Sequence, residues 1–212
     1  IVDVDGNALA TGHFGMRFDV GSSSTLQMNA SDINIDRAGS SNSHHSMYFN
    51  AATGNIRGVV DQLQISNAQA SGIYILNSGA GDFDTTFSNV TILSPSTQAI
   101  YLDRNSTGVL SPTFDGVNII SGVNASNHSI LVDNASPIFA ATSSTSVDGG
   151  WSGLALISSA GDYENITINN AVTAAISLSS NSVPTTFGNI AVNGSPTPFN
   201  IGGQSLPAVV VA

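Results

Sequence analysis

The stretch from Phe87 to Phe114, FSNVTILSPSTQAIYLDRNSTGVLSPTF, is followed by a second one, DGVNIISGVNASNHSILVDNASPIF, which repeats its pattern and ends at Phe139. Each stretch carries a first triplet with alternating apolar residues, a run of small polar residues, a second triplet and then an aromatic residue. The first triplets are Val90-Thr-Ile92 and Val117-Asn-Ile119, and the second are Ile100-Tyr-Leu102 and Ile130-Leu-Val132. Self-similarity with a period of roughly 20 to 50 residues is typical of solenoids and repeat arrays.

The same pattern extends over most of the chain. Aromatic residues recur at separations of 24 to 27 residues, at Phe87, Phe114, Phe139, Tyr163 and Phe187. Further first triplets are Leu26-Gln-Met28, Leu63-Gln-Ile65, Ile166-Thr-Ile168 and Ile190-Ala-Val192, and further second triplets are Met47-Tyr-Phe49, Ile73-Tyr-Ile75 and Ile176-Ser-Leu178. Short alternating segments between Gly, Asn, Ser, Pro and Asp turns predict strands, and no segment sustains the apolar spacing of a helix.

Strands that recur at a similar offset predict a coil in which each strand pairs in parallel with its counterpart one turn further on. Val, Ile, Leu and Phe would then stack in inward columns, while Thr, Ser, Asn and Tyr would face water. On these repeated triplets the chain resembles the right-handed parallel β-helix (pectin-lyase-like) superfamily, and it is similar to secreted surface and adhesin β-solenoids. The resemblance implies an all-β fold, for which the chain length gives about eight coils.

The alternative fold is a β-sandwich, which also has short strands with frequent turns. Within the solenoid, we expect an N-terminal edge, cap or junction segment at residues 1–25 and β-solenoid repeats at residues 26–199. Residues 200–212 are expected to form a C-terminal strand or linker.

The composition indicates a folded chain with few ionisable groups. Hydrophobic residues make up 41% of the chain and charged residues only 8%, so there are enough apolar side chains to bury a core. The 4 basic residues, all arginines, face 14 acidic ones, and the net charge is -10. We therefore expect no nucleic acid partner, and no apolar run approaches the roughly 20 residues of a transmembrane segment. The absence of cysteine excludes disulfides, and the start at Ile1 without Met indicates a processed product or a piece of a longer chain.

Enzymes of the superfamily that the chain resembles act mostly on acidic polysaccharides. A glycosidase needs two carboxylates about 5 to 9 Å apart. Asp82 and Asp84 in AGDFD, and Asp162 and Glu164 in AGDYE, are the candidate catalytic residues, since their local sequences match. The competing interpretation is that Gly-Asp marks a corner of the coil, where Asp accepts backbone N–H groups. The Asn-Thr-Asp, Asp-Asp and Gly-His-Gly patterns of the family's hydrolases do not occur, which argues against catalysis.

Two features bear on metal binding. DVDGN places oxygen ligands at Asp3, Asp5 and Asn7, as calcium loops do, but Gly stands at the fourth position and no Glu closes the loop. A solvated turn is the alternative. His44 and His45 are adjacent, so they would point to opposite sides of a strand, and SSNSHHS predicts an exposed loop in which they have no role. We expect no cofactor, with calcium as the candidate metal.

Tyr48, Tyr74 and Tyr101 are the candidate ligand-binding residues. Each is the middle residue of a second triplet, so we expect them to point outward from one face of successive coils as an exposed aromatic ladder. Such a ladder suits a glycan, or it serves only to stack across strands. Sequons permit glycosylation at eight positions if the host modifies the chain: Asn29, Asn89, Asn105, Asn124, Asn127, Asn134, Asn165 and Asn193.

These features favour a non-enzymatic extracellular or cell-surface protein, adhesin-like or part of a self-assembling filament or surface layer. The terminal sequences IVDVDG and LPAVVVA are strand-like and show no cap, so we expect them to pair with neighbouring domains or with copies of the same protein. A polysaccharide lyase or glycoside hydrolase is the first alternative, and a carbohydrate-binding module is the second.

Overall fold

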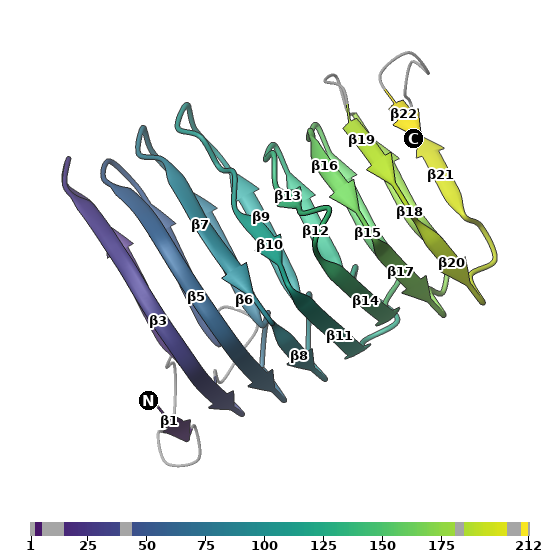
Figure 1. Ribbon diagram of the computed structural model, residues 1–212, viewed down its shortest axis with the longest axis horizontal. Coiled ribbons are helices and arrows are strands. Elements are labelled where there is room, and N and C mark those ends of the chain that lie inside the picture. Colours follow the sequence, from purple (N-terminus) through teal and green to yellow (C-terminus); the bar gives the residue numbers. More distant parts are fainter. Residues whose placement is uncertain (1–2, 6–14, 39–43, 181–184, 203–208, 212) are drawn as a thin grey trace.

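The computed structural model describes residues 3–5, 15–38, 44–180, 185–202 and 209–211, and within these ranges it contains strands and no helix. Every strand pairing is parallel. The strands stack into a β-solenoid of about seven turns, with the coils in sequence order along the long axis (Figure 1). This confirms the predicted all-β parallel solenoid, with about seven turns where about eight were expected, and excludes the sandwich, whose sheets are antiparallel.

One side of each coil is a strand of an eight-stranded sheet. Its order is β2-β4-β6-β9-β12-β15-β18-β21, so each inner strand lies between its counterparts in the previous and next coils. The strands are β2 (Met16–Val20), β4 (Met47–Ala51), β6 (Ile73–Asn77), β9 (Ile100–Arg104), β12 (Ile130–Asp133), β15 (Ser152–Ile157), β18 (Ala174–Ser179) and β21 (Phe199–Gly202). Strands β2 and β21 pair in the same way as the inner strands, although their residues fall partly or wholly outside 26–199.

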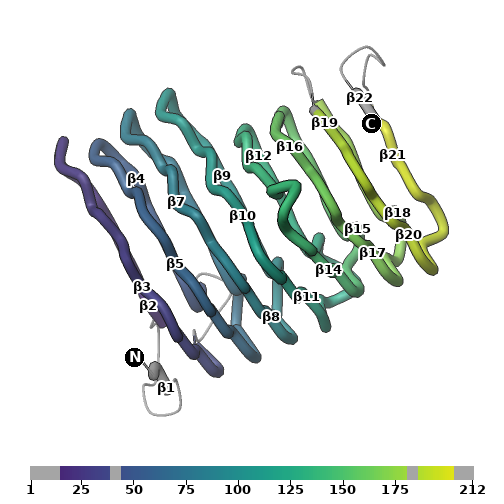
Figure 2. The backbone as a smooth tube through the Cα atoms, viewed as in Figure 1, coloured from purple at the N-terminus to yellow at the C-terminus, as the bar shows by residue number. Residues whose placement is uncertain are grey.

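The other two sides belong to a 14-stranded sheet. Strands β3 (Thr25–Asp36) and β5 (Asn55–Ser66) run over both sides, whereas later coils use two shorter strands, so the sheet branches beside β5. One branch is β7 (Phe83–Ser88), β10 (Thr113–Asp115), β13 (Ile138–Phe139), β16 (Gly161–Glu164), β19 (Thr185–Gly188) and β22 (Val209–Val211). The other is β8 (Thr91–Leu93), β11 (Val117–Val123), β14 (Ser144–Gly149), β17 (Ile166–Asn169) and β20 (Ala191–Asn193). Figure 2 shows the backbone passing around these sides turn after turn.

The corner between the two branches is made by residues in the left-handed backbone region. Asp32 and Gln62 bend the long strands β3 and β5 with φ values of 55° and 52°. In later coils Asn89, Asn165 and Asn189 adopt the same conformation, with φ between 52° and 55°. Asn and Asp tolerate this region better than other non-glycine residues because their short side chains bond to nearby backbone. The corners of the coil thus account for the positions of these Asn residues in the sequence.

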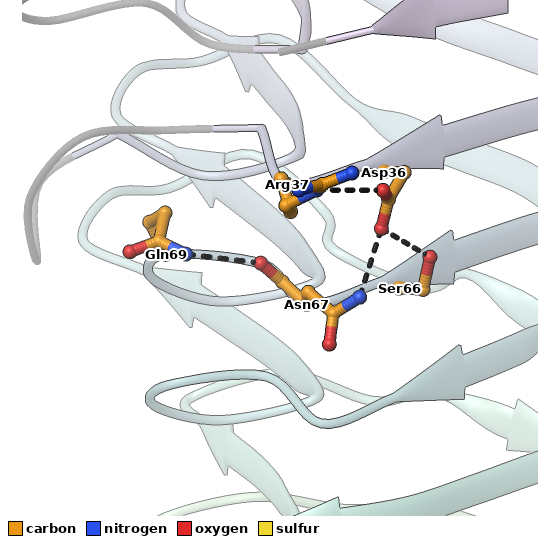
Figure 3. A network of polar contacts seen from close by, with 5 residues as sticks. All are labelled: Asp36, Arg37, Ser66, Asn67 and Gln69. Carbon is orange, nitrogen blue, oxygen red and sulfur yellow. Dashed lines mark hydrogen bonds and ion pairs between the residues drawn. The ribbon is translucent and has the colours of Figure 1, made fainter. Parts of the chain in front are cut away.

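A second corner is held by polar side chains that cross between coils (Figure 3). Ser66 Oγ and Asn67 Nδ2 donate to the Oδ1 atom of Asp36 at 2.7 and 2.9 Å, and the Arg37 Nε group donates to its Oδ2 atom at 2.9 Å. Gln69 Nε2 donates to the backbone carbonyl of Asn67 at 3.3 Å. Hydrogen bonds from Asn67, Ser66 and Arg37 lower the pKa of Asp36 to about 2. Each corner therefore ties one coil to the next as well as turning the chain.

The core contains a column of aromatic rings on the inner side of the β7 branch, among many buried aliphatic side chains. Phe87, Phe114, Phe139, Tyr163 and Phe187 are fully buried. Successive ring centroids are 5.5, 4.9, 5.6 and 5.4 Å apart, and the rings are stacked. The recurring aromatics of the sequence thus form one continuous column. Offset stacking contributes beyond the burial of apolar area, so each ring stabilises the two coils beside it.

The first triplet Val117-Asn-Ile119 faces the wrong way relative to the prediction. Val117 and Ile119 are 57% and 43% exposed, while Asn118 and Ile120 are each 1% exposed. The cause is one extra residue in β11: Asp115 pairs with Ser88, but Ile119 pairs with Thr91. Because side chains alternate along a strand, one inserted residue exchanges the inward and outward sets.

Because the aromatic rings form a continuous column, we predict that removing a ring from its middle strongly destabilises the fold. Phe139→Ala should reduce the free energy of unfolding by about 3–5 kcal/mol, because it removes a fully buried ring with neighbours on both sides. The matched control is Ile138→Ala, since Ile138 precedes Phe139 in β13 and is 38% exposed. Equilibrium unfolding in urea measures both, and the control should change stability by less than about 1 kcal/mol. Equal losses from both variants would contradict the inner column.

Candidate functional site

The tyrosine face is the outer side of the eight-stranded sheet where Tyr48, Tyr74 and Tyr101 stand on successive strands β4, β6 and β9. The strand register places Tyr48 opposite Tyr74 and Tyr74 opposite Tyr101. Tyr48 and Tyr74 meet edge to face at 5.5 Å, and Tyr74 and Tyr101 stack at 4.8 Å with an interplanar angle of 9°. The three residues thus form an aromatic ladder along the solenoid axis.

The three rings of the ladder differ in how much of each is exposed to solvent. Tyr48 is only 8% exposed, whereas Tyr74 and Tyr101 are half-buried. One face of Tyr101 covers Tyr74, and its other face is directed toward the next coil, where Leu131 occupies the same column. The end of the ladder at Tyr101 is therefore where a ring face is not covered by another tyrosine.

At the Tyr48 end of the ladder, His45 and Arg17 pack against the tyrosine rings. The His45 ring lies 4.4 Å from the Tyr74 ring and 6.1 Å from the Tyr48 ring, between centroids. The guanidinium carbon of Arg17 lies 5.2 Å from the centroid of Tyr48. His45 is only 8% exposed, so its predicted place in an exposed loop was wrong. The neighbouring coil buries it, because Ser71 donates its backbone N–H to Nδ1 of His45 at 3.3 Å.

An acidic row runs beside the ladder, two positions further along each strand. By register it consists of Asp19, Asn50, Leu76, Asp103 and Asp133. Asp103 is 7% exposed and accepts hydrogen bonds at Oδ2 from the Tyr74 hydroxyl at 2.9 Å and from Asn105 Nδ2 at 3.2 Å. Asp133 stands opposite Asp103 in the next coil and accepts a hydrogen bond from Asn134 Nδ2 at 3.0 Å.

Burial and the charge of Asp103 raise the pKa values of nearby groups on this face. Burial, and then Asp103, raise the pKa of Tyr101 to about 12, and the same two causes raise the pKa of Tyr74 well above its usual value. Burial and the charge of Asp103 raise the pKa of Asp133. The carboxylates of Asp103 and Asp133 therefore repel each other in a partly desolvated setting.

Sequence reasoning missed Asp103, Asp133 and His45 as members of this face. A signal for the two carboxylates was present, because Asp directly follows the second triplet in both IYLD and ILVD. No comparable local signal marks His45, since its burial comes from residues of the next coil. The three tyrosines do form a ladder on successive strands, but the expected exposure was wrong for Tyr48, which is buried, and Tyr74 and Tyr101 are only half-buried.

The predicted catalytic carboxylates lie on other sides of the solenoid. Asp84 is on β7 and Asp162 and Glu164 are on β16, and β10 and β13 separate these two strands. The two pairs therefore lie on different coils, while Asp162 and Glu164 stand two positions apart on one strand and so share one side of it. Asp82 accepts the backbone N–H of Val109 at Oδ1 at 3.0 Å and lies 3.9 Å from Arg57. The hydrogen bond from the Val109 N–H gives Asp82 the corner role that was named above as the alternative to catalysis.

The predicted calcium ligands are only partly described. Asp3 and Asp5 lie on strand β1 (Asp3–Asp5), which pairs with Asn34 to Asp36 of β3, and Asn7 lies outside the described residues. Across the part of the chain that the structure describes, no group of three or more His, Cys, Asp and Glu side chains is placed to hold a metal ion. The same residues contain no helix long and apolar enough to cross a membrane.

Most sequon asparagines donate from Nδ2, the atom a glycan would modify, to a neighbouring oxygen. Asn89 donates to Asp61 at 2.9 Å, and Asn165 donates to the carbonyl of Ala141 at 2.6 Å. The others that do so are Asn105, Asn127, Asn134 and Asn193. Asn29 and Asn124 are exposed, and Asn124 accepts the N–H of Ser126 at its Oδ1 atom. Modification at Asn29 or Asn124 would thus disturb the fewest of these contacts.

The burial of His45 predicts acid sensitivity. Burial lowers the pKa of His45 to about 4, below the unfolded value of about 6.5, so the unfolded chain binds more protons between these pH values. Stability should be full above about pH 6.5 and fall by on the order of 1–3 kcal/mol as the pH drops toward about 4. His45→Gln should weaken this dependence in urea unfolding, while His44→Gln should preserve most of it, because burial is the larger cause of the lowered pKa and the charge of His44 the smaller. Burial also lowers the pKa of His128, so some dependence should remain. If the stability of His45→Gln changed with pH in the same way as that of the parent protein does, His45 would not be the source of the acid sensitivity.

Comparisons of the chain with protein-family models, with curated proteins and with solved structures gave no match. The tyrosine face is therefore defined by its own contacts, burial and charge. Its stacked rings and the flanking carboxylates are the features from which a function is inferred.

Proposed function

We propose that the protein is a non-enzymatic extracellular solenoid of the adhesin-like kind, whose tyrosine face contacts glycans at a cell surface. The observation that carries this proposal is the ladder of Tyr48, Tyr74 and Tyr101 on three successive coils. Aromatic rings supply large and rigid contact area, and polar groups at their edges fix the orientation of a bound molecule. This joins the surface-protein hypothesis with the carbohydrate-binding alternative.

Both flanks of the ladder carry polar groups suited to hydroxyl-rich ligands. On one side the half-buried Thr97 and Gln98 are held by hydrogen bonds with Ser71 Oγ at 3.0 and 3.4 Å, and Ser71 itself is buried. On the other side stand the carboxylates of the acidic row. Because strand pairing and the Tyr74–Asp103 hydrogen bond hold these groups in place, little ordering accompanies binding. We also assign the chain to the right-handed parallel β-helix superfamily, in agreement with the usual handedness of parallel crossovers.

The ends of the solenoid are proposed to pair with neighbouring domains or with copies of the same protein. Among the described residues, β2 and β21 each pair on one side only within the eight-stranded sheet. On β21, Phe199 is half-buried and Ile201 is 38% exposed. Unpaired strand edges readily accept a further strand.

Glycan binding is predicted to depend on Tyr101, the last ring of the ladder. Tyr101→Leu keeps a strand-compatible residue, the one found at Leu131 in the same column, but removes the ring. On glycan arrays and in calorimetry with any glycan bound there, this variant should lose roughly tenfold in affinity or more, equivalent to about 1.4 kcal/mol. Val117→Ser removes an apolar side chain that is 57% exposed on the 14-stranded sheet and serves as the control. Absence of binding to any glycan would refute the proposal, and release of reducing ends would favour an enzyme instead.

Assembly through the ends is predicted to respond to a charge on the terminal strand. If the parent protein forms fibres or sheets at high concentration, as expected, Ile201→Lys should shorten or abolish them in electron micrographs, because lysine on an edge strand opposes strand addition. Ile138→Lys is the matched control, since Ile138 is also 38% exposed but lies on the side of the solenoid. Imaging with and without calcium tests the candidate metal in the same experiment. Isolated short rods for the parent protein would count against pairing of the ends.

A further inference from the structure

We propose that copies of this chain stack head to tail, so that the last coil of one copy pairs in register with the first coil of the next. This inference rests on the proposed pairing of the ends, and it adds the partner, its direction and its register. It is carried by the apolar core at both ends, by the order of the strands along the two edges and by the distribution of charge between them.

The apolar core is incompletely covered at both ends of the solenoid. The hydrophobic residues that pack against the core but are only partly buried lie in the first and last described coils: Met16, Phe18, Leu26, Ala30, Ile190, Val192 and Phe199. Ile201, on the last strand of the eight-stranded sheet, is 38% exposed. Covering these side chains with a further coil would remove apolar surface from water, which favours association.

The two edges present the same three sides of the coil in the same order. At one end the strands are β1 beside the β8 branch, β2 in the eight-stranded sheet and the first half of β3 beside the β7 branch. At the other end they are β20, β21 and β22, on the same three sides and in the same order (Figure 1). Among the described strands, each of these has one edge unpaired. A second copy placed head to tail therefore continues the coil, with its β1 on β20, its β2 on β21 and its β3 on β22.

The register inside the solenoid determines which residues would meet at such a junction. Met16 and Phe199 stand at the two ends of one inward column, and Phe18 and Ile201 stand at the two ends of the next. Stacking in the same register places Phe199 against Met16 of the next copy and Ile201 against Phe18 of the next copy. Apolar side chains then meet apolar side chains, whereas a shift by one residue would set them against the outward set.

Charge is present on one edge and absent from the other. Strands β20, β21 and β22 contain no charged residue and no proline, the two devices that commonly protect an edge strand from pairing. Strands β1 and β2 carry Asp3, Asp5, Arg17 and Asp19. Head-to-tail stacking sets this charged edge against the neutral one. Because such a contact joins two different surfaces, each added copy leaves a free edge, and the stack grows as a filament.

The test uses pairs of introduced cysteines, because the chain has none of its own. Arg17 and Asn200 are exposed and stand at the two ends of one outward column. In the proposed stack their Cα atoms in adjacent copies are about 4.8 Å apart, within the roughly 4.4–6.8 Å that a disulfide spans. After mild oxidation at high protein concentration, Arg17→Cys, Asn200→Cys should give dimers, trimers and longer chains on a non-reducing gel, and reduction should return them to monomer.

The matched control is the double variant Arg17→Cys, Asn193→Cys. Asn193 is also exposed at the C-terminal edge, but it lies on β20, which faces β1 in the proposed stack, so this variant should form no ladder. Each single variant, Arg17→Cys or Asn200→Cys, should remain monomeric when oxidised alone. An equimolar mixture of the two single variants should give dimers and nothing longer. Thermal unfolding of each variant shows that a missing crosslink is not a loss of folding.

The outcomes separate this inference from the proposed function. Crosslinking of either single variant with itself would overturn the head-to-tail direction, and a ladder of equal yield from the control would overturn the register. Fibres of the parent protein without a disulfide ladder from Arg17→Cys, Asn200→Cys would overturn the inference and leave pairing of the ends in place. Isolated rods with no crosslink would remove both, while glycan contact through the tyrosine face is tested by its own binding measurements.

Discussion

The whole structure depends on in-register parallel pairing between successive coils. Because each strand pairs with its own counterpart one turn away, every side chain lies beneath the side chain at the same position of the next coil. A residue type that packs well with itself is then repeated, which accounts for the aromatic column from Phe87 to Phe187 and for the tyrosine ladder outside. The same rule makes a single misplaced polar group costly, since it meets apolar neighbours above and below.

Strand β11 shows how the fold accommodates such a misplaced group. The extra residue before Asn118 brings this amide into an inward column that holds Val90 in the previous coil and Thr145 in the next. Asn118 Oδ1 accepts the N–H of Val90 at 3.2 Å, and Asn118 Nδ2 donates to Thr145 Oγ1 at 3.2 Å. Buried polar groups are tolerated when their hydrogen bonds are made, so two adjacent polar residues satisfy each other inside the column.

The sequence predicted the features that depend on periodicity alone. The repeat of aromatic residues gave the inward column, and the middle positions of Met47-Tyr-Phe49, Ile73-Tyr-Ile75 and Ile100-Tyr-Leu102 gave the ladder. Features that depend on the exact pairing between coils could not be predicted. The exposure of Val117 follows from one inserted residue, and the burial of His45 follows from contacts with Ser71 and Tyr74 of the next coil. Neither is visible in the alternation of a single strand.

Regular stacking and ligand binding compete for the same ring surface. A ring between two like rings, as Tyr74 is between Tyr48 and Tyr101, has its faces covered by protein and offers only its edge and hydroxyl. A column changes its chemistry where its repeat is broken, as at the step from Tyr101 to Leu131. The neighbouring row changes one coil earlier, where Leu76 gives way to Asp103, and this brings a half-buried ring, Tyr101, close to the carboxylates of Asp103 and Asp133. In a solenoid of this kind the repeat supplies stability, and the interruptions of the repeat supply the positions at which chemistry differs from one coil to the next.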